Sequence, residues 1–174
     1  MKKILLMGPQ GCGKDTQAEK IAKKYGLVHI STGDILRKHI ADKTPLGLEY
    51  EHNYRSGRMA SNTVIYKIVK EALTDEVISK GFILNGFPRT ADQLFWLYER
   101  THIDGCLYID LDIDTCVKRL LDRGRSDDNE EGIKRRLSDF KSKTAKLLKD
   151  IGTVVKVDGS QSINKVFKEI EEHL

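Results

Sequence analysis

Five short apolar runs recur along the chain, and longer amphipathic stretches separate them. The runs cover residues 3–7, 27–30, 82–84, 106–111 and 153–157. Their nearly continuous hydrophobicity is typical of strands that are buried on both faces and joined by helical crossovers. The pattern therefore predicts an α/β fold built on a parallel sheet.

Helical periodicity fills most of the chain between these runs. It predicts helices at 14–25, 33–41, 46–56, 61–80, 91–100, 114–123, 129–150 and 162–173. Ser61 or Asn62, and Asp114 or Thr115, are the expected starts of two of them, because such side chains cap helix N-termini. Residues 31–60 are too many for one crossover, and 124–129 is a short charged interruption. We expect both segments to be mobile elements that close over substrates.

The size and charge of the chain narrow its class. A length of 174 residues suits one compact domain, and 39% hydrophobic with 32% charged residues is typical of a folded protein. The formal charge of +4 suits either a small polyanionic substrate or an ordinary solvated surface. Basic residues do not form a run interleaved with aromatics, so we expect no nucleic-acid partner.

Targeting signals and cysteine motifs are not evident. The first apolar run meets Gly8-Pro9 after four residues, which is too short for a signal peptide or a membrane span. Cys12, Cys106 and Cys116 are scattered singly, so we expect neither a disulfide framework nor a zinc site. A cytoplasmic protein with reduced thiols and no membrane partner is the resulting prediction.

The strongest chemical signal follows the first apolar run. The sequence GPQGCGKDT at 8–16 contains the GxxxxGK part of the P-loop pattern and precedes a helical pattern. Glycines let the backbone N–H groups face a phosphate, and Lys14 would reach the β- and γ-phosphates. Asp15 occupies the position where the general pattern has a Ser or Thr near Mg²⁺, and Thr16 follows it.

Further blocks extend the pattern over nearly the whole chain. They are ISTGDILR (30–37), GFILNGFPRTADQ (81–93), RLLDRGR (119–125), DDNEEGIKRRL (127–137) and KVDGS (156–160). With GPQGCGKDTQA (8–18) they resemble adenylate kinase and related nucleoside monophosphate kinases. The resemblance implies a P-loop NTPase-type, five-stranded parallel sheet flanked by helices, with a core of 1–30, 61–123 and 131–174. It also implies a helical monophosphate-binding insertion at 31–60, a short lid at 124–130 and a monomer.

The resemblance also assigns binding roles to individual positions. Donor ATP is expected to contact Gly11, Cys12, Gly13, Lys14, Asp15, Thr16, Arg119, Arg123 and Gln161. Acceptor AMP is expected to contact Thr32, Arg37, Arg58, Met59, Ala60, Gly86, Phe87, Pro88, Arg89, Gln93, Arg125 and Arg136. Lys14, Arg89, Arg123, Arg125 and Arg136 are the expected catalytic set, since guanidinium groups bind phosphate oxygens in pairs and neutralise their charge.

The implied reaction is the reversible, Mg²⁺-dependent transfer of a phosphoryl group from ATP to AMP, which gives two ADP. An acceptor phosphate oxygen attacks the γ-phosphorus in line, so catalysis consists of positioning and charge stabilisation. Closure over the substrates would exclude water and prevent hydrolysis.

Two departures from the family pattern concern the metal. Asn85 stands where the family usually has Asp, and Asp15 stands where it usually has Gly. One hypothesis is that Asp15 replaces the missing carboxylate; the alternative is that Asp15 is a favourable acidic residue at a helix start. We assign no direct protein ligand for the metal, and Thr16, Asn85 and Asp15 are candidates for its outer shell. Asp110 is either a further outer-shell carboxylate or an ordinary strand-end residue.

Another departure leaves the acceptor base open. The family pattern changes at Arg58-Met59-Ala60-Ser61, whereas Gln93 favours adenine. A UMP/CMP kinase is therefore the near alternative. A catalytically weakened nucleotide-binding regulatory protein is the alternative from another class, and the complete set of phosphate-facing cations argues against it.

Overall fold

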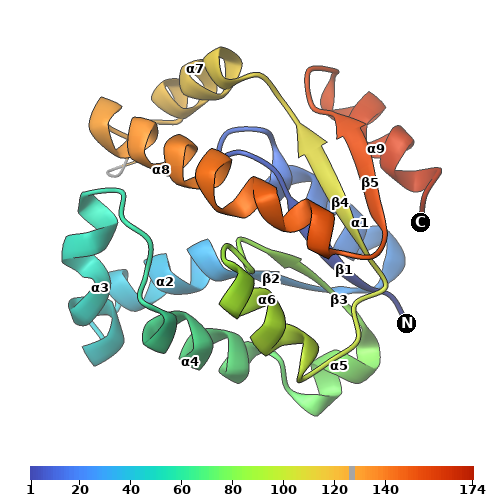
Figure 1. Ribbon diagram of the computed structural model, residues 1–174, viewed down its shortest axis with the longest axis horizontal. Helices are drawn as coiled ribbons and strands as arrows, with labels where there is room; N and C mark the ends of the chain where they lie inside the picture. Colours follow the sequence, from blue (N-terminus) through green and yellow to red (C-terminus); the bar gives the residue numbers. More distant parts are fainter. Residues whose placement is uncertain (126–127) are drawn as a thin grey trace.

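The protein is an α/β structure with a five-stranded parallel sheet, seen in a computed structural model that describes residues 1–125 and 128–174 (Figure 1). The strands are β1 (Lys3–Met7), β2 (Val28–Ser31), β3 (Phe82–Asn85), β4 (Gly105–Asp110) and β5 (Val154–Asp158). Their order is β2-β3-β1-β4-β5, and every neighbouring pair is parallel. This confirms the predicted fold class, and each strand lies within a residue or two of its apolar run.

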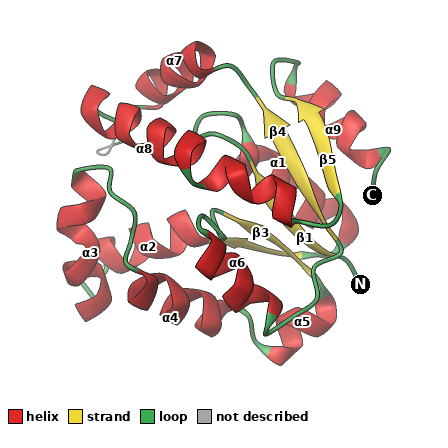
Figure 2. Ribbon diagram, viewed as in Figure 1, coloured by secondary structure: helices red, strands yellow, loops and turns green. Residues whose placement is uncertain are grey.

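Helices cover both faces of the sheet (Figure 2). They are α1 (Lys14–Tyr25), α2 (Thr32–Ala41), α3 (Pro45–Arg55), α4 (Asn62–Ala72), α5 (Asp75–Lys80), α6 (Ala91–Tyr98), α7 (Ile113–Arg123), α8 (Glu130–Ser142), the 3-10 helix η1 (Thr144–Asp150) and α9 (Ile163–Glu171). Among these described helices, none combines the length and apolar content needed to cross a membrane.

Alternating side chains of the strands divide the core into two clusters. Leu5 and Met7 of β1 pack into one cluster with α2, α3, α4 and α6. Ile4 and Leu6 pack into the other with α1, α7, α8 and α9. Residues 4–7 of β1 are all apolar, so the strand serves both layers, which explains the hydrophobic runs in the sequence.

Side-chain caps fix most of the helix starts in the described chain. A hydroxyl, carboxylate or amide oxygen accepts a hydrogen bond from a backbone N–H in the first turn of seven helices, each worth about 1 kcal/mol. The capping residues are Ser31, Thr44, Ser61, Thr74, Thr90, Asp112 and Asn129. The cap at Ser61 agrees with one of the two predicted starts. The predicted start at Asp114 or Thr115 is wrong, because Asp112 caps α7 two residues earlier.

The prediction of one helix over 61–80 is wrong, because the segment forms α4 and α5. Leu73 leaves helical geometry with φ −93° and ψ 65°. Thr74 then caps the next helix by accepting a hydrogen bond from the backbone N–H of Val77. Apolar residues continue at helical spacing across the break, and this periodicity hides it in the sequence.

The prediction of one helix over 129–150 is also wrong. The α-helix α8 ends at Ser142, and Lys143 departs from helical geometry with φ −120° and ψ −64°. A 3-10 helix continues the chain to Asp150. Thr144 marks the change, because its hydroxyl donates to the backbone oxygen of Arg89 over 3.1 Å and so ties this segment to the site.

Residues 31–60 form a tight helical pair between β2 and α4 (Figure 1). Gly47 allows α3 to approach α2, since a Cβ there would lie 2.0 Å from the backbone oxygen of His39. After α3, the chain passes close to α8: a Cβ on Gly57 would lie 2.6 Å from the Cα of Gly132. The monophosphate-binding role of this pair stays a prediction. The predicted short lid at 124–130 includes residues 126 and 127, which lie outside the described residues.

Candidate active site

The loop between β1 and α1 forms a compact turn at the carboxyl end of the sheet. Gly13 begins α1 in the left-handed region, with φ 98°. Gly8 lies so close to β4 that a Cβ would be 2.4 Å from the backbone oxygen of Ile109. Lys14 Nζ donates to the backbone oxygens of Gly8 and Pro9, both over 2.7 Å. The turn therefore holds Lys14 at the head of a helix, the position from which an anion is bound.

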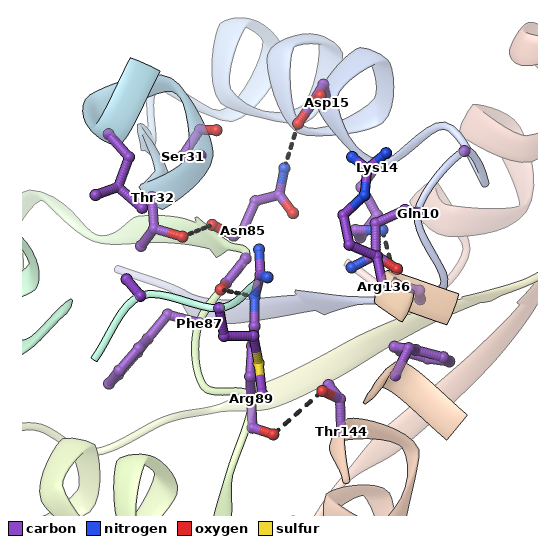
Figure 3. A pocket seen from close by; sticks show the side chains of 18 of the residues that line it. Gln10, Lys14, Asp15, Ser31, Thr32, Asn85, Phe87, Arg89, Arg136 and Thr144 are labelled. Atoms are coloured by element: carbon purple, nitrogen blue, oxygen red, sulfur yellow. Dashed lines mark hydrogen bonds between the residues drawn. The ribbon is translucent and has the colours of Figure 1, made fainter. Parts of the chain in front are cut away.

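This loop lines a cavity of about 370 Å³, which is within the usual size range of ligand sites. The cavity lies between the phosphate loop, the α2–α3 pair, the segment after β3 and the arginines of α7 and α8. Figure 3 shows Lys14, Arg89 and Arg136 from these separate elements around one space. The sequence predicts that Lys14 and these arginines come together in one site, and here they line one cavity.

Most of the predicted site residues line this cavity. Twenty do so: Gly11, Gly13, Lys14, Asp15, Thr16, Thr32, Arg37, Arg58, Met59, Ala60, Asn85, Gly86, Phe87, Pro88, Arg89, Gln93, Arg119, Arg123, Arg125 and Arg136. Two do not: the Cys12 side chain is buried in the core, and Gln161 donates to Glu169 over 2.8 Å. The individual binding roles of all these residues stay predictions.

Arg89 is fixed at the floor of the cavity. Its Nε donates to the backbone oxygen of Gly86 over 2.8 Å, which leaves the outer guanidinium nitrogens facing the cavity (Figure 3). Burial lowers the pKa of the Arg89 guanidinium, and nearby Arg136 and Arg37 lower it further. An anion that binds here would relieve both effects, because it places a negative charge beside the buried guanidinium.

Asp128 is a site residue to which the sequence interpretation assigned no role. Its carboxylate accepts two hydrogen bonds from Arg123, both over 2.8 Å, and one from Arg136 over 2.7 Å. It also accepts from the backbone N–H of Arg125 over 3.2 Å. Burial acts to raise the pKa of Asp128, but the hydrogen bonds from the two arginines outweigh it and lower the pKa. The residue lies in the block at 127–137, but its burial could not be read from that charged run.

Asp15 and Asn85 form a pair across the cavity wall. Asn85 Nδ2 donates a hydrogen bond to the Asp15 carboxylate (Figure 3). Arg125 approaches the same carboxylate, with Nη2 3.8 Å from Asp15 Oδ2. By contrast, Asp110 is held outside the cavity by the Tyr108 hydroxyl at 3.0 Å and by Lys156 at 2.8 Å. Asp110 is thus an ordinary strand-end residue in this arrangement.

Gln93 also lines the cavity and is held in one orientation. Its Oε1 accepts from the backbone N–H of Arg89 over 2.8 Å, and its Nε2 donates to Asn62 Oδ1 over 2.9 Å. A backbone N–H can only donate, so the Gln93 amide cannot turn over without losing this bond. Asn62 was not among the predicted site residues, and its contact with Gln93 joins positions 31 residues apart.

The fold and this site define a P-loop phosphotransferase of the nucleoside monophosphate kinase class. The family model described as adenylate kinase matches residues 6–152. The chain therefore belongs to the adenylate kinase family.

Relatives named adenylate kinase match over nearly their whole length. One from Prochlorococcus marinus (strain NATL2A) is 38% identical and covers 99% of this chain and 98% of its own. One from Leptospira biflexa is 38% identical, with 95% and 96% covered. A protein named adenylate kinase 1 from Nostoc sp. is also 38% identical, with 100% and 99% covered.

Proposed function

We propose that this protein transfers a phosphoryl group between ATP and AMP, with two ADP as the product of the forward direction. The observation that carries the proposal is the convergence of Lys14 with arginines from β3–α6, α7 and α8 on one cavity. The names of the relatives support the choice of AMP as acceptor. We also infer a monomeric enzyme from the family resemblance, and a cytoplasmic one from the short first apolar run.

The donor side of the cavity would be formed by the phosphate loop and α7. Lys14 would bind the β- and γ-phosphates and neutralise their charge. Its Nζ is already held at the head of α1 by the backbone oxygens of Gly8 and Pro9. Arg119 and Arg123 lie one helical turn apart on α7 and face the same cavity. Nucleotide phosphates would compete with Asp128 for Arg123.

The acceptor side would be formed by α2, the segment after α3 and the turn after β3. Arg37 and Arg89 would hold the phosphate of AMP, and each lines the cavity. Arg125 and Arg136 would bridge the two nucleotides during transfer. Cations from both sides would then neutralise the transferred group, which is the main catalytic contribution in reactions of this type.

The residues at the phosphate loop fit a magnesium ion bound mainly through phosphates and water. Asp15, Thr16 and Asn85 line the cavity beside Lys14, and Asn85 Oδ1 is buried without a hydrogen-bond partner among the described residues. Mg²⁺ keeps several waters in such sites, and those waters need acceptors. When bound, the ion would neutralise charge on the β- and γ-phosphates.

The fixed orientation of Gln93 supports adenine as the acceptor base. Its carbonyl oxygen accepts from Arg89 and its amide nitrogen donates to Asn62, and each group retains one further hydrogen-bonding site. An amide held this way can offer a donor and an acceptor to a base edge; adenine presents the complementary pair at N1 and N6, as cytosine does at N3 and N4, so the acceptor panel must separate these two bases.

An acceptor panel tests the proposal. The purified protein with ATP and Mg²⁺ is given AMP, GMP, CMP, UMP or dTMP, and diphosphate formation is followed by a coupled assay. We expect kcat/KM for AMP to exceed that for the pyrimidine nucleotides by about 100-fold or more. Comparable or higher rates with CMP or UMP would reject AMP as the acceptor, and tight ATP binding without turnover would favour a regulatory protein.

A further inference from the structure

Asp15 and Asn85 are joined, although they come from different elements and lie 70 residues apart. Asp15 is in the first turn of α1, directly after the phosphate-loop lysine, and Asn85 is the last residue of β3. β3 is the strand next to β1, so both residues border the same corner of the cavity. The Asp15 side chain remains 40% exposed toward the cavity, which leaves one face of the carboxylate accessible.

Asn85 carries a second signal that points to a ligand. The residue is 4% exposed, and its Oδ1 is buried with no partner in the described part of the chain. The amide nitrogen points to Asp15 (Figure 3), whereas the oxygen is buried and has no donor among the described residues. A buried carbonyl oxygen without a partner is unfavourable, so a donor such as a water or a cation is expected there when the site is occupied.

P-loop enzymes generally hold Mg²⁺ between a hydroxyl that follows the lysine and an aspartate on a neighbouring strand. In this chain the aspartate is Asp15, on the loop side, and the strand position holds the amide of Asn85. We propose that Asp15 supplies the carboxylate that binds the water shell of the Mg²⁺ on the donor nucleotide, and that Asn85 positions it. The inference rests on the proposed function, because it requires a nucleotide in the cavity.

Arg125 gives the carboxylate a second partner when the metal is absent. Its guanidinium lies 3.8 Å from the Asp15 carboxylate, and the Arg125 side chain is 31% exposed. Asp15 therefore places a negative charge beside the proposed phosphate sites, and its ion pair with Arg125 is long and partly exposed. It should weaken the binding of metal-free ATP by repulsion and strengthen the binding of Mg²⁺-ATP. This opposite pair of effects distinguishes a metal role from a purely structural one.

The test is a binding measurement that needs no turnover. Calorimetry gives the Kd of ATP with excess Mg²⁺ and with EDTA, and the ratio of the two is the metal coupling factor. We expect Asp15→Asn to lower this factor by about 10-fold or more, since outer-shell partners commonly change metal affinity by that amount. Metal-free ATP should bind Asp15→Asn at least as tightly as the wild type.

The exchanged double variant Asp15→Asn with Asn85→Asp keeps the hydrogen bond and the net charge. It should restore the coupling factor to within about threefold of the wild type, because the carboxylate returns to the strand side. Asp114→Asn, an exposed change at the start of α7, is the matched control and should leave the factor unchanged. Circular dichroism verifies that each variant is folded.

An unchanged coupling factor in folded Asp15→Asn would overturn the inference. So would a folded double variant that stays as defective as the single one. Neither result would contradict the proposed function, because that is tested separately by the acceptor panel with the wild-type protein.

Discussion

Removing the charge of Asp128 should both destabilise the protein and loosen two arginines that we propose to be catalytic. The side chain of Asp128 is fully buried, and those of Arg136 and Arg123 are 10% and 29% exposed. In Asp128→Asn the shape is kept, but two guanidinium groups lose their shared carboxylate. An amide cannot accept all the hydrogen bonds that converge on this position.

The size of the effect follows from these exposures. Breaking a buried ion pair by removing one partner costs about 3–5 kcal/mol. Arg123 and Arg136 border an open cavity and can regain water, so we take the lower end, about 3 kcal/mol. For a chain of this length, about 1 kcal/mol lowers Tm by about 2–4 °C, so a loss of about 6–12 °C is expected.

Scanning calorimetry without nucleotide measures this change. Glu51→Gln is the matched control, because it is also an acid-to-amide change in an ion pair, with Arg55 at 2.6 Å on the surface of α3. That pair should contribute less than about 0.5 kcal/mol. A Tm for Asp128→Asn within about 2 °C of the wild type, as expected for the control, would refute the prediction that the buried Asp128 carboxylate stabilises the protein through Arg123 and Arg136.

Three further predictions concern pH, catalysis and the thiols. The pKa of Asp128 is lower in the folded than in the unfolded protein. Its contribution to the free energy of unfolding is therefore complete above the unfolded pKa of about 3.9 and is lost as pH falls through the folded pKa. Tm should drop more between about pH 5 and 3 in the wild type than in Asp128→Asn. Lys14→Met should lower kcat by about 10²–10³ in steady-state assays, and an unchanged kcat would exclude the assigned role. Burial raises the pKa of Cys106 and of Cys116 to about 12, so a thiol reagent at pH 8 should leave both unmodified until the protein unfolds; rapid labelling of either would contradict this.

The sheet could be predicted from the sequence because its signals are local. Each strand is a short apolar run, and GPQGCGKDT lies between such a run and a helix in the order that a phosphate loop requires. The helix breaks at Leu73 and Lys143 were missed because apolar periodicity continues across them. Thr74 caps the helix that follows the first break, and Thr144 donates to Arg89 at the second. The contact of Thr144 with Arg89 is long-range, so the sequence near the break does not reveal it.

The site could be predicted as a set of positions but not as a network. Lys14 and the arginines were found because they lie in motifs with a known order along the chain. The burial of Asp128, the bond from Gln93 to Asn62 and the bond from Asn85 to Asp15 depend on which segments meet in space. Composition and spacing carry little information about such contacts, since a surface carboxylate and a buried one look alike in a sequence.

We propose that the cavity transfers a phosphoryl group to AMP and not to water. ATP labelled at the γ-phosphate, incubated with AMP, Mg²⁺ and the protein, tests it directly by showing which product receives the label. The account predicts label in the β-phosphate of ADP, and a loss of this transfer in Lys14→Met. Label found mainly in inorganic phosphate, at a rate that AMP does not change, would contradict it.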